Sequence, residues 1–368
     1  MASEEKFDKD IENIKFQLQN EIIKLCSIAT VSGFESRATE KVSSMYRGRL
    51  DSFYCDAVGN HILLRSCGRK DAVKIMIDAH LDEIGFVVTE VLDGGFLRIA
   101  NIGGIDRAII QGAEVTVLGD ETLHGVIAST PPHLKGDDDK LPTIDKALVD
   151  VGLGYSKEEL EKIACVGTPV IFDKTYTSLK SGRLAGPSFD NKACGAIAIC
   201  AVTSLEPSEL AGDVYITLSC REETASRGGA YLCANRISPD YAMVIDVNLA
   251  NAPDVSERES VPMGEGISIS YSSSTSRALT RECARLCREG EIPFTPKAEP
   301  SSTGTNAVAV NIAGGGVPVV DVGLPLRNMH TYNEIIALDD CYSLYRFIRA
   351  FVTSRELAEG FAREEGEI

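Results

Sequence analysis

The sequence contains no tryptophan, and aromatic residues make up only 6% of its 368 residues. A glycoside hydrolase needs two carboxylates that flank a sugar groove, preferably together with aromatic side chains that stack on the sugar. The scarcity of aromatic residues therefore argues against an enzyme that cleaves polysaccharides.

Long apolar runs are also missing. No stretch of about 18 consecutive apolar residues occurs, and the first ten residues, MASEEKFDKD, are polar and acidic. Both features argue against a membrane span and against a secretory signal peptide. We therefore expect a cytoplasmic protein that has no membrane partner.

Basic residues are in the minority: the sequence has 37 lysines and arginines against 54 aspartates and glutamates, and its net charge is −17. This charge repels phosphate backbones, so we expect no nucleic-acid partner. The eleven cysteines include no Cys-x-x-Cys pair, and several, such as Cys194 and Cys200, have apolar neighbours. They are predicted to be reduced core thiols, not disulfides or thiolate metal ligands.

Patterning along the chain predicts an α/β fold. Helical spacing of apolar residues covers 7–28 and 38–50, and short β-rich runs follow at 61–65 and 73–80. Beyond about residue 174, predicted strands and helices alternate. Alternation of this kind is typical of a mixed, mostly parallel sheet with helices on both faces.

The segment from 85 to 173 has a different pattern, with many short β-rich runs, glycine-rich turns and one short helix at 156–164. This pattern favours a small β-barrel or sandwich. The predicted organisation is therefore an α/β domain in two parts, 1–84 and 174–368, interrupted by an inserted β-rich domain at 85–173, and any catalytic site is expected in the α/β domain.

Polar residues follow several predicted strands of the α/β part. Ligands of open α/β sheets bind beyond the carboxyl ends of the strands. The residues at these ends are His80, the pair Glu222 and Glu223, Asp246 and His330. Asp190 lies at the predicted start of a helix, where a carboxylate can also meet exposed amide groups.

Two imidazoles and three carboxylates match a pair of divalent ions such as Zn²⁺, Co²⁺ or Mn²⁺, with one carboxylate bridging both. Asp82 follows His80 by two residues and can hydrogen-bond its imidazole. Glu222 and Glu223, adjacent on an extended segment, point in different directions. One of them can bind metal while the other acts as a general base.

Each of these residues alone also has a structural interpretation, because paired glutamates are often solvated and histidines near strand ends are often structural. Only their joint placement favours a site. His61 and His133 are predicted to be structural or turn residues, and His124 to lie in the inserted domain. Residues 313–318, AGGGVP, are predicted to be a turn before a strand, since a phosphate loop would need a lysine and a following helix. Arg327 is compatible either with binding a carbonyl or carboxylate group or with a structural role.

Several motifs carry a resemblance that covers nearly the whole chain. They include AHLDEIGFVV, SFDNKACGA, REETASRGGA, VIDV, TGTNAVAV and GVPVVDVGLPLRNMHTYNEI. In these motifs the sequence resembles the tetrahedral glutamyl aminopeptidase family of metallopeptidases, whose members are often labelled endoglucanase or deblocking aminopeptidase. The resemblance implies that His80 and Asp246 bind one metal, Glu223 and His330 the other, and that Asp190 bridges them.

The resemblance also implies an activity and an assembly. Glu222 is expected to be the general base in hydrolysis of the N-terminal peptide bond, and Asp82 its orienting neighbour through His80. The ions are expected to be zinc or cobalt, or else manganese. The inserted domain is expected to mediate dimerisation, and dimers to form a dodecameric shell whose substrates are peptides.

The sequence departs from the family pattern at several positions. They are Ala225 and Ser226, where a glycine-leucine pair is common, Asn306 in place of aspartate, Asn328 in place of an aromatic residue, and Thr331 in place of serine. Because these positions are expected near the substrate pocket, the family's preference for the N-terminal residue does not transfer to this chain. A reduced or altered activity is an alternative. Another two-metal amide hydrolase, such as an acyl-amino-acid deacylase, and a catalytically silent shell-forming relative remain alternatives.

Overall fold

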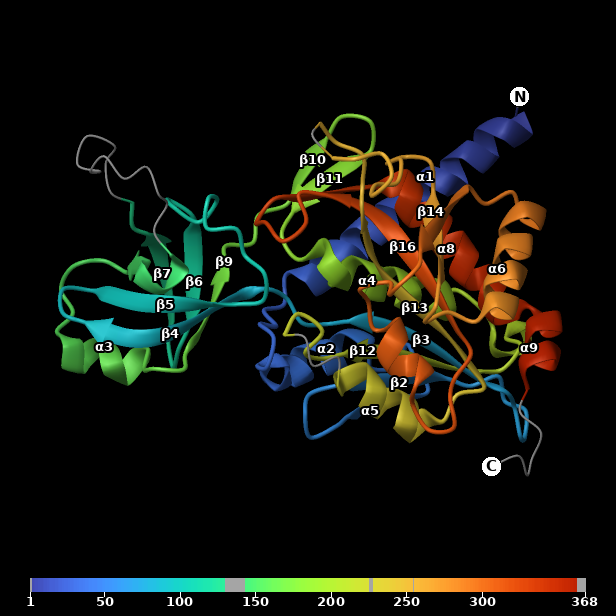
Figure 1. Cartoon of the computed structure of the whole chain (residues 1–368), viewed down its shortest axis with the longest axis horizontal. Coiled ribbons are helices and arrows are strands. Elements are labelled where there is room, and N and C mark those ends of the chain that lie inside the picture. The colour runs from blue at the N-terminus through green and yellow to red at the C-terminus, as the bar shows by residue number, and fades with distance from the viewer. Residues whose placement is uncertain (1, 130–142, 225–227, 254, 363–368) are drawn as a thin grey trace.

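The computed structural model describes residues 2–129, 143–224, 228–253 and 255–362, with side chains from residue 9 onward. An α/β body carries a β-barrel at one side (Figure 1). This arrangement confirms the predicted fold class of a mixed, mostly parallel sheet with helices and a small barrel. His133, Ala225 and Ser226 lie outside the described residues.

The body is built on one sheet of eleven strands. Its main path runs β1 (Ser52–Cys55), β2 (His61–Arg65), β12 (Asp213–Ser219), β3 (Lys74–His80), β13 (Tyr241–Leu249), β16 (Val319–Arg327), β17 (Glu334–Ala337), β11 (Arg183–Gly186) and β10 (Thr177–Leu179). β14 (Ile267–Ser272) pairs with β16 and with β15 (Phe294–Glu299). Strands β12, β3, β13 and β16 are parallel neighbours. β3 is buried along almost its whole length, as expected for a parallel strand covered on both faces.

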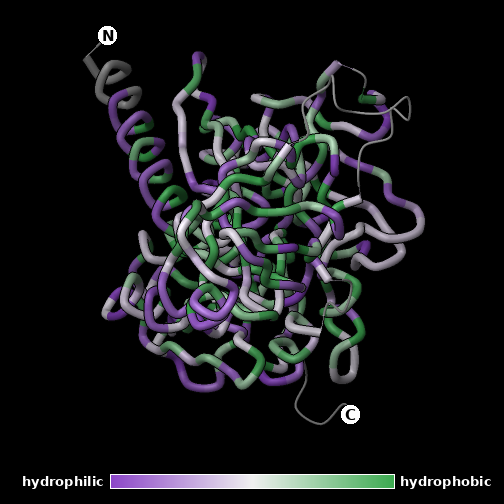
Figure 2. Tube along the Cα trace, turned by 90° about the vertical axis from the view of Figure 1, so that its left-hand side faces the viewer, coloured by the Kyte–Doolittle hydropathy of each residue, from purple (hydrophilic) through white to green (hydrophobic). Residues whose placement is uncertain are grey.

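Helices cover both faces of this sheet. One face packs against α1 (Ala2–Cys26), α2 (Thr39–Tyr46), α4 (Phe189–Thr203), α6 (Arg277–Glu289), α8 (Leu338–Thr353) and α9 (Arg355–Phe361). The other face packs against α5 (Gly228–Ile237) and α7 (Ala307–Asn311). α4 is apolar on nearly all sides, and almost all its residues are buried, because α1 and α8 cover the side that faces away from the sheet. Hydrophobic segments accordingly gather inside the body (Figure 2).

The barrel closes in the order β4 (Gly85–Leu92), β5 (Phe96–Ile102), β8 (Leu148–Asp150), β7 (Thr122–Ile127), β6 (Glu114–Leu118) and β9 (Pro169–Phe172). It has its own apolar core, which includes Phe86, Ile99 and Val115, and the helix α3 (Lys157–Ile163) packs against it. Within the described part of the chain, every helix is too short or too polar to cross a membrane.

His61 begins β2 and is fully buried beside the ring of Phe53, with 5.4 Å between ring centroids. Among the described residues, neither ring nitrogen of His61 has a hydrogen-bond partner. Burial lowers the pKa of His61 from 6.5 to about 4, because a charged imidazole is poorly solvated there. The imidazole is therefore neutral in the folded protein at neutral pH.

This pKa shift makes stability depend on pH. Between pH 6.5 and 4 the unfolded chain protonates His61 and the folded chain does not, so acid favours unfolding. We expect His61 to lower the free energy of unfolding by roughly 2 kcal/mol between pH 8 and pH 5. His61→Phe should lose less stability than the wild type over this interval, as measured by urea unfolding at both pH values. Equal losses in the two proteins would contradict this account.

Candidate active site

The carboxyl ends of four parallel strands meet at one edge of the sheet. His80 is the last residue of β3 and pairs with Ser219 at the end of β12, so the segment that carries Glu222 and Glu223 leaves the sheet beside it. In β13, Asp246 pairs with Gly323 of β16, and His330 follows β16 by three residues. The register of the sheet thus brings together residues that are far apart in the sequence.

Asp190 lies between the two imidazoles. Its Oδ1 is 3.1 Å from Nε2 of His80, and its Oδ2 is 3.4 Å from Nε2 of His330. Oδ1 of Asp246 is 3.6 Å from the His80 Nε2, and Oε2 of Glu223 is 3.3 Å from the His330 Nε2. Two groups, each of one histidine and one carboxylate, therefore share Asp190.

The site concentrates buried carboxylates, and histidines are their ion-pair partners among the described residues. Burial, and then the charge of Asp190, raise the pKa of Glu223 well above its usual range. Burial likewise raises the pKa of Asp246 to about 7, although His80 opposes the shift.

This donor set fits divalent cations. Ligand atoms of His80, Asp190 and Glu223 all lie within 4.8 Å of one another. Imidazole nitrogens and carboxylate oxygens suit zinc, cobalt and manganese. Bound cations would also balance the charge of Glu223 and Asp246, whose pKa values are raised by burial and then by the charge of Asp190.

Asp82 contacts more than the imidazole that the sequence suggested. The Nδ1 of His80 lies 3.0 Å from the backbone carbonyl oxygen of Asp82 and 3.6 Å from its carboxylate. The carboxylate accepts hydrogen bonds from the backbone N–H groups of Glu222, at 3.1 Å, and of Glu223, at 3.0 Å. The carbonyl thus orients the imidazole, so that Nε2 faces the other carboxylates. The carboxylate of Asp82 holds the turn at residues 220–223, here called the glutamate turn.

Two further side chains that sequence reasoning missed hold the same turn. Glu35 accepts the N–H of Arg221 at 3.0 Å, and Asn60 accepts that of Cys220 at 2.8 Å. Arg221 has a positive φ of 62°, a conformation that needs support from its surroundings. Glu35 and Asn60 lie in the segments VSGFES and DAVGNHILL, where no spacing pattern distinguishes them.

Glu334 was also missed. Its carboxylate is buried and accepts the backbone N–H groups of Asp190, at 3.1 Å, and of His330, at 3.2 Å. Burial and the charge of Asp190 raise the pKa of Glu334 to about 8. One carboxylate therefore fixes the backbone of two proposed ligands. The search for polar residues beyond the carboxyl ends of strands did not find Glu334, because this residue begins a strand instead of following one.

Asn306 does not line the pocket beside the site. It is 1% exposed, and its Nδ2 donates to Asp78 and to Ser219, both at 3.0 Å. These partners lie near the ends of β3 and β12, so the departure at position 306 affects the support beneath the site.

The other singled-out residues have simple surroundings. Arg327 donates to the backbone oxygen of Asn251 at 2.6 Å, which favours its structural interpretation. Thr331 lines the pocket, and Asn328 donates to the backbone oxygen of Asn333 at 3.1 Å. His124 lies on β7 of the barrel, as predicted, and is exposed.

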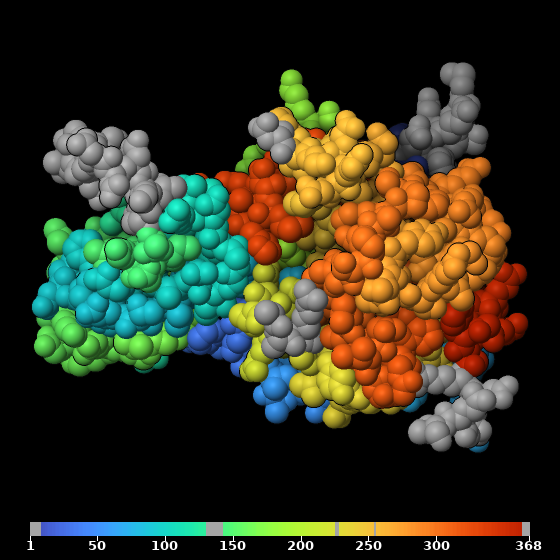
Figure 3. Space-filling model, viewed as in Figure 1, coloured from blue at the N-terminus to red at the C-terminus, as the bar shows by residue number. Residues whose placement is uncertain are grey.

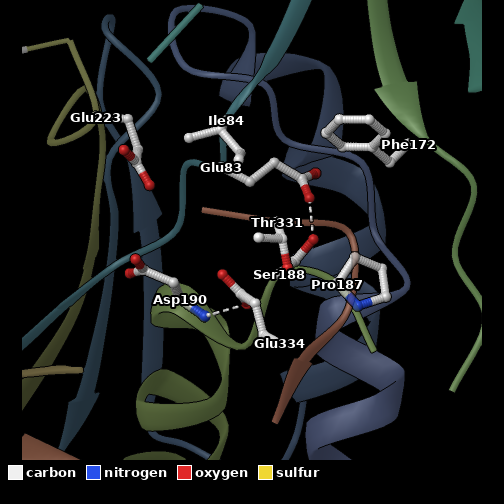
Figure 4. Close-up of a pocket in the computed structure, with 9 residues that line it drawn as sticks. All are labelled: Glu83, Ile84, Phe172, Pro187, Ser188, Asp190, Glu223, Thr331 and Glu334. Carbon is white, nitrogen blue, oxygen red and sulfur yellow. Dashed lines mark hydrogen bonds between the residues drawn. The ribbon is translucent and has the colours of Figure 1, made fainter. Parts of the chain in front are cut away.

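A pocket adjoins the carboxylates (Figure 4). It is lined by Glu83, Ile84, Phe172, Pro187, Ser188, Asp190, Glu223, Thr331 and Glu334. Figure 4 shows the carboxylates of Asp190 and Glu223 on one side and Phe172 and Pro187 on the other. At about 10 Å³ the pocket has room for about one water molecule beside the carboxylates.

Comparison with known proteins gives consistent similarities. Residues 59–347 match the model of a family described as M42 glutamyl aminopeptidase. The lysyl aminopeptidase of Pyrococcus furiosus is 28% identical over 335 residues, which cover 89% of this chain and 95% of that protein.

Solved structures agree over almost the same length. An aminopeptidase of Desulfurococcus kamchatkensis superposes with a TM-score of 0.85 and 28% identity, over 96% of this chain and 99% of the other. The TET1 peptidase of Pyrococcus horikoshii superposes with a TM-score of 0.80 and 27% identity, over 91% of this chain and 99% of the other. That peptidase is described as able to assemble into a tetrahedron or a large octahedral shell.

The contacts of Asp190 predict the effect of its removal on metal binding. Asp190→Asn takes away the carboxylate shared by both groups, so bound zinc or cobalt should fall from about two ions per chain to fewer than one. Elemental analysis after dialysis measures this. Asp340→Asn is the matched control, because Asp340 is fully buried and, among the described residues, its hydrogen bonds come from the N–H groups of Gly264 and Gly266 and not from proposed ligands. An unchanged metal content in Asp190→Asn would contradict the ligand assignment.

Proposed function

The chain belongs to the M42 glutamyl aminopeptidase family, and we propose that it is a two-metal aminopeptidase that removes the N-terminal residue of peptides. His80 and Asp246 would hold one ion, Glu223 and His330 the other, and Asp190 both. The observation that carries the proposal is that the two oxygens of Asp190 face different imidazoles. The bound ions would supply an acidified water and electron withdrawal from the scissile carbonyl.

Glu222 is the proposed general base. It is half-buried, and its negative charge contributes to the raised pKa of Asp246, which means that its carboxylate lies near the site. Its backbone N–H is held by Asp82. Glu222 would take a proton from the attacking water and transfer it to the departing amine. Asp82 would act by holding Glu222 and Glu223 at fixed positions.

Self-association is part of the proposal. The TET1 relative is described as forming closed shells. On this chain, the barrel exposes large apolar side chains, with 89% exposure of Leu153, 64% of Val166 and 43% of Val126. Burial of such side chains favours association, so we infer that the barrel carries a dimer interface and that dimers assemble further, up to a dodecamer.

Glu222→Gln tests the assigned role directly. Glutamine keeps the size of the side chain but cannot accept the proton, so kcat should fall about 100- to 10,000-fold. Metal content should stay unchanged, because Glu222 is not a proposed ligand. Glu257→Gln, at an exposed position, is the control and should keep full activity. Near-normal rates in Glu222→Gln would show that the base is another group.

The substrate class needs a separate measurement. Aminoacyl anilides with acidic, basic and aliphatic residues should be hydrolysed at least about 100-fold faster than their N-acetylated counterparts, because the proposed enzyme requires a free amine. A preference for the acylated compounds would indicate a deacylase. Absence of both activity and bound metal would indicate a catalytically silent relative.

A further inference from the structure

The barrel contacts the proposed metal centre of its own chain. Gly103 and Gly104 directly follow β5 and form a turn at the end of the barrel nearest the body. A Cβ atom added to Gly104 would lie 3.1 Å from Nδ1 of His330. One added to Gly103 would lie 2.8 Å from Ile84 and 3.5 Å from Cβ of Glu223. The turn therefore packs against both proposed ligands of one ion.

A second contact joins the barrel to the loop that carries His330. The ring of Phe172, at the end of β9, lies 5.4 Å from the ring of Tyr332. In Figure 3 the orange-red surface beyond β16 adjoins the teal surface of the barrel. His330 has a positive φ of 60°, and Glu334 accepts its backbone N–H. The body thus fixes the backbone of His330, while the barrel limits the space for its imidazole.

The two connections between barrel and body meet at a buried ion pair. Glu83 precedes the first barrel strand and Lys174 follows the last one, and Nζ of Lys174 lies 2.5 Å from Oε2 of Glu83. Lys174 also donates to the backbone oxygen of Cys26 at 2.8 Å and to Oγ of Ser188 at 2.7 Å. The pair therefore joins both connections to the end of α1 and to the segment before Asp190.

Glu83 is fixed from its other side as well. Its Oε1 lies 2.8 Å from Nζ of the fully buried Lys192 and accepts the N–H of Thr30 at 2.7 Å. Burial would raise the pKa of Glu83, but the two ammonium groups lower it to about 2. The cluster holds two ammonium groups and one carboxylate, so loss of Lys174 leaves the Glu83–Lys192 pair but removes the bonds that tie Lys174 to Glu83, Cys26 and Ser188.

We propose that the barrel helps to shape the metal centre. The Gly103–Gly104 turn limits the position of the His330 imidazole, and the Glu83–Lys174 pair holds this turn in place. Gly104 and Lys174 are then positioning residues. This inference rests on the proposed two-metal function. It adds that the domain proposed to mediate self-association also shapes one of the two ion sites.

Gly104→Ala is the sharpest test. The backbone of Gly104 is not in the left-handed region, so alanine is tolerated there and the main effect is a methyl group against His330. Calorimetric titration of the metal-free protein with Zn²⁺ should show one of two sites weakened at least about tenfold and the other unchanged. kcat/KM should fall by at least a similar factor. Gly315→Ala is the control, because an added Cβ there has no atom within 4 Å.

Lys174→Met tests the ion pair. It should weaken the same ion site and also speed proteolytic cleavage at the barrel connections, whereas Lys174→Arg should restore both properties, since it keeps the charge. Lys15→Met is the control, because Lys15 is similarly shielded and pairs with Asp339 at 2.6 Å, and it should change neither property.

The outcomes distinguish this inference from the proposed function. If the wild type binds two ions and hydrolyses peptides, and Gly104→Ala has the same ion affinities, the inference is overturned and the function stands. If the wild type binds no ion, both are overturned. Should Lys174→Met fail to fold, Gly104→Ala alone decides.

Discussion

One carboxylate joins the two halves of the candidate site, because it contacts two imidazoles. Asp190 faces His80 with one oxygen and His330 with the other, and Glu334 fixes its backbone from behind. His80 lies 110 residues before Asp190 in the sequence and His330 lies 140 residues after it. They converge on this group because neighbouring parallel strands end at one edge. The sheet therefore determines the geometry of the site, and loops add the support.

Buried carboxylates have two roles in the site: some are proposed metal ligands, and others hold the backbone that carries those ligands. Asp82 and Glu35 accept successive backbone amides of the glutamate turn, and Glu334 accepts those of two proposed ligands. A carboxylate can accept several hydrogen bonds at once and so can order a strained segment. Burial of these carboxylates, and then their mutual repulsion, raises the pKa values of Glu223 and Asp246, so cations suit the site.

Sequence patterns predicted the parts of the molecule that follow from burial and periodicity. The central strands and five of the barrel strands have clear apolar patterns, and the polar residues at strand ends could be grouped by a rule of topology. The short strands β1, β8 and β10 were not predicted, because segments of three or four residues that are exposed in whole or in part carry little pattern. Glu35, Asn60 and Glu334 escaped because they act on backbone amides, and no spacing rule marks an acceptor for a distant N–H group.

The wide separation of the proposed ligands has a consequence for synthesis of the chain. Residue 80 leaves the ribosome early, but its partners at 190 and 246 follow much later, and residue 330 comes last. Until that final segment has emerged, the polypeptide lacks one imidazole and the strand that delivers it. A growing chain therefore cannot assemble the proposed metal centre until this last segment has emerged and joined the sheet.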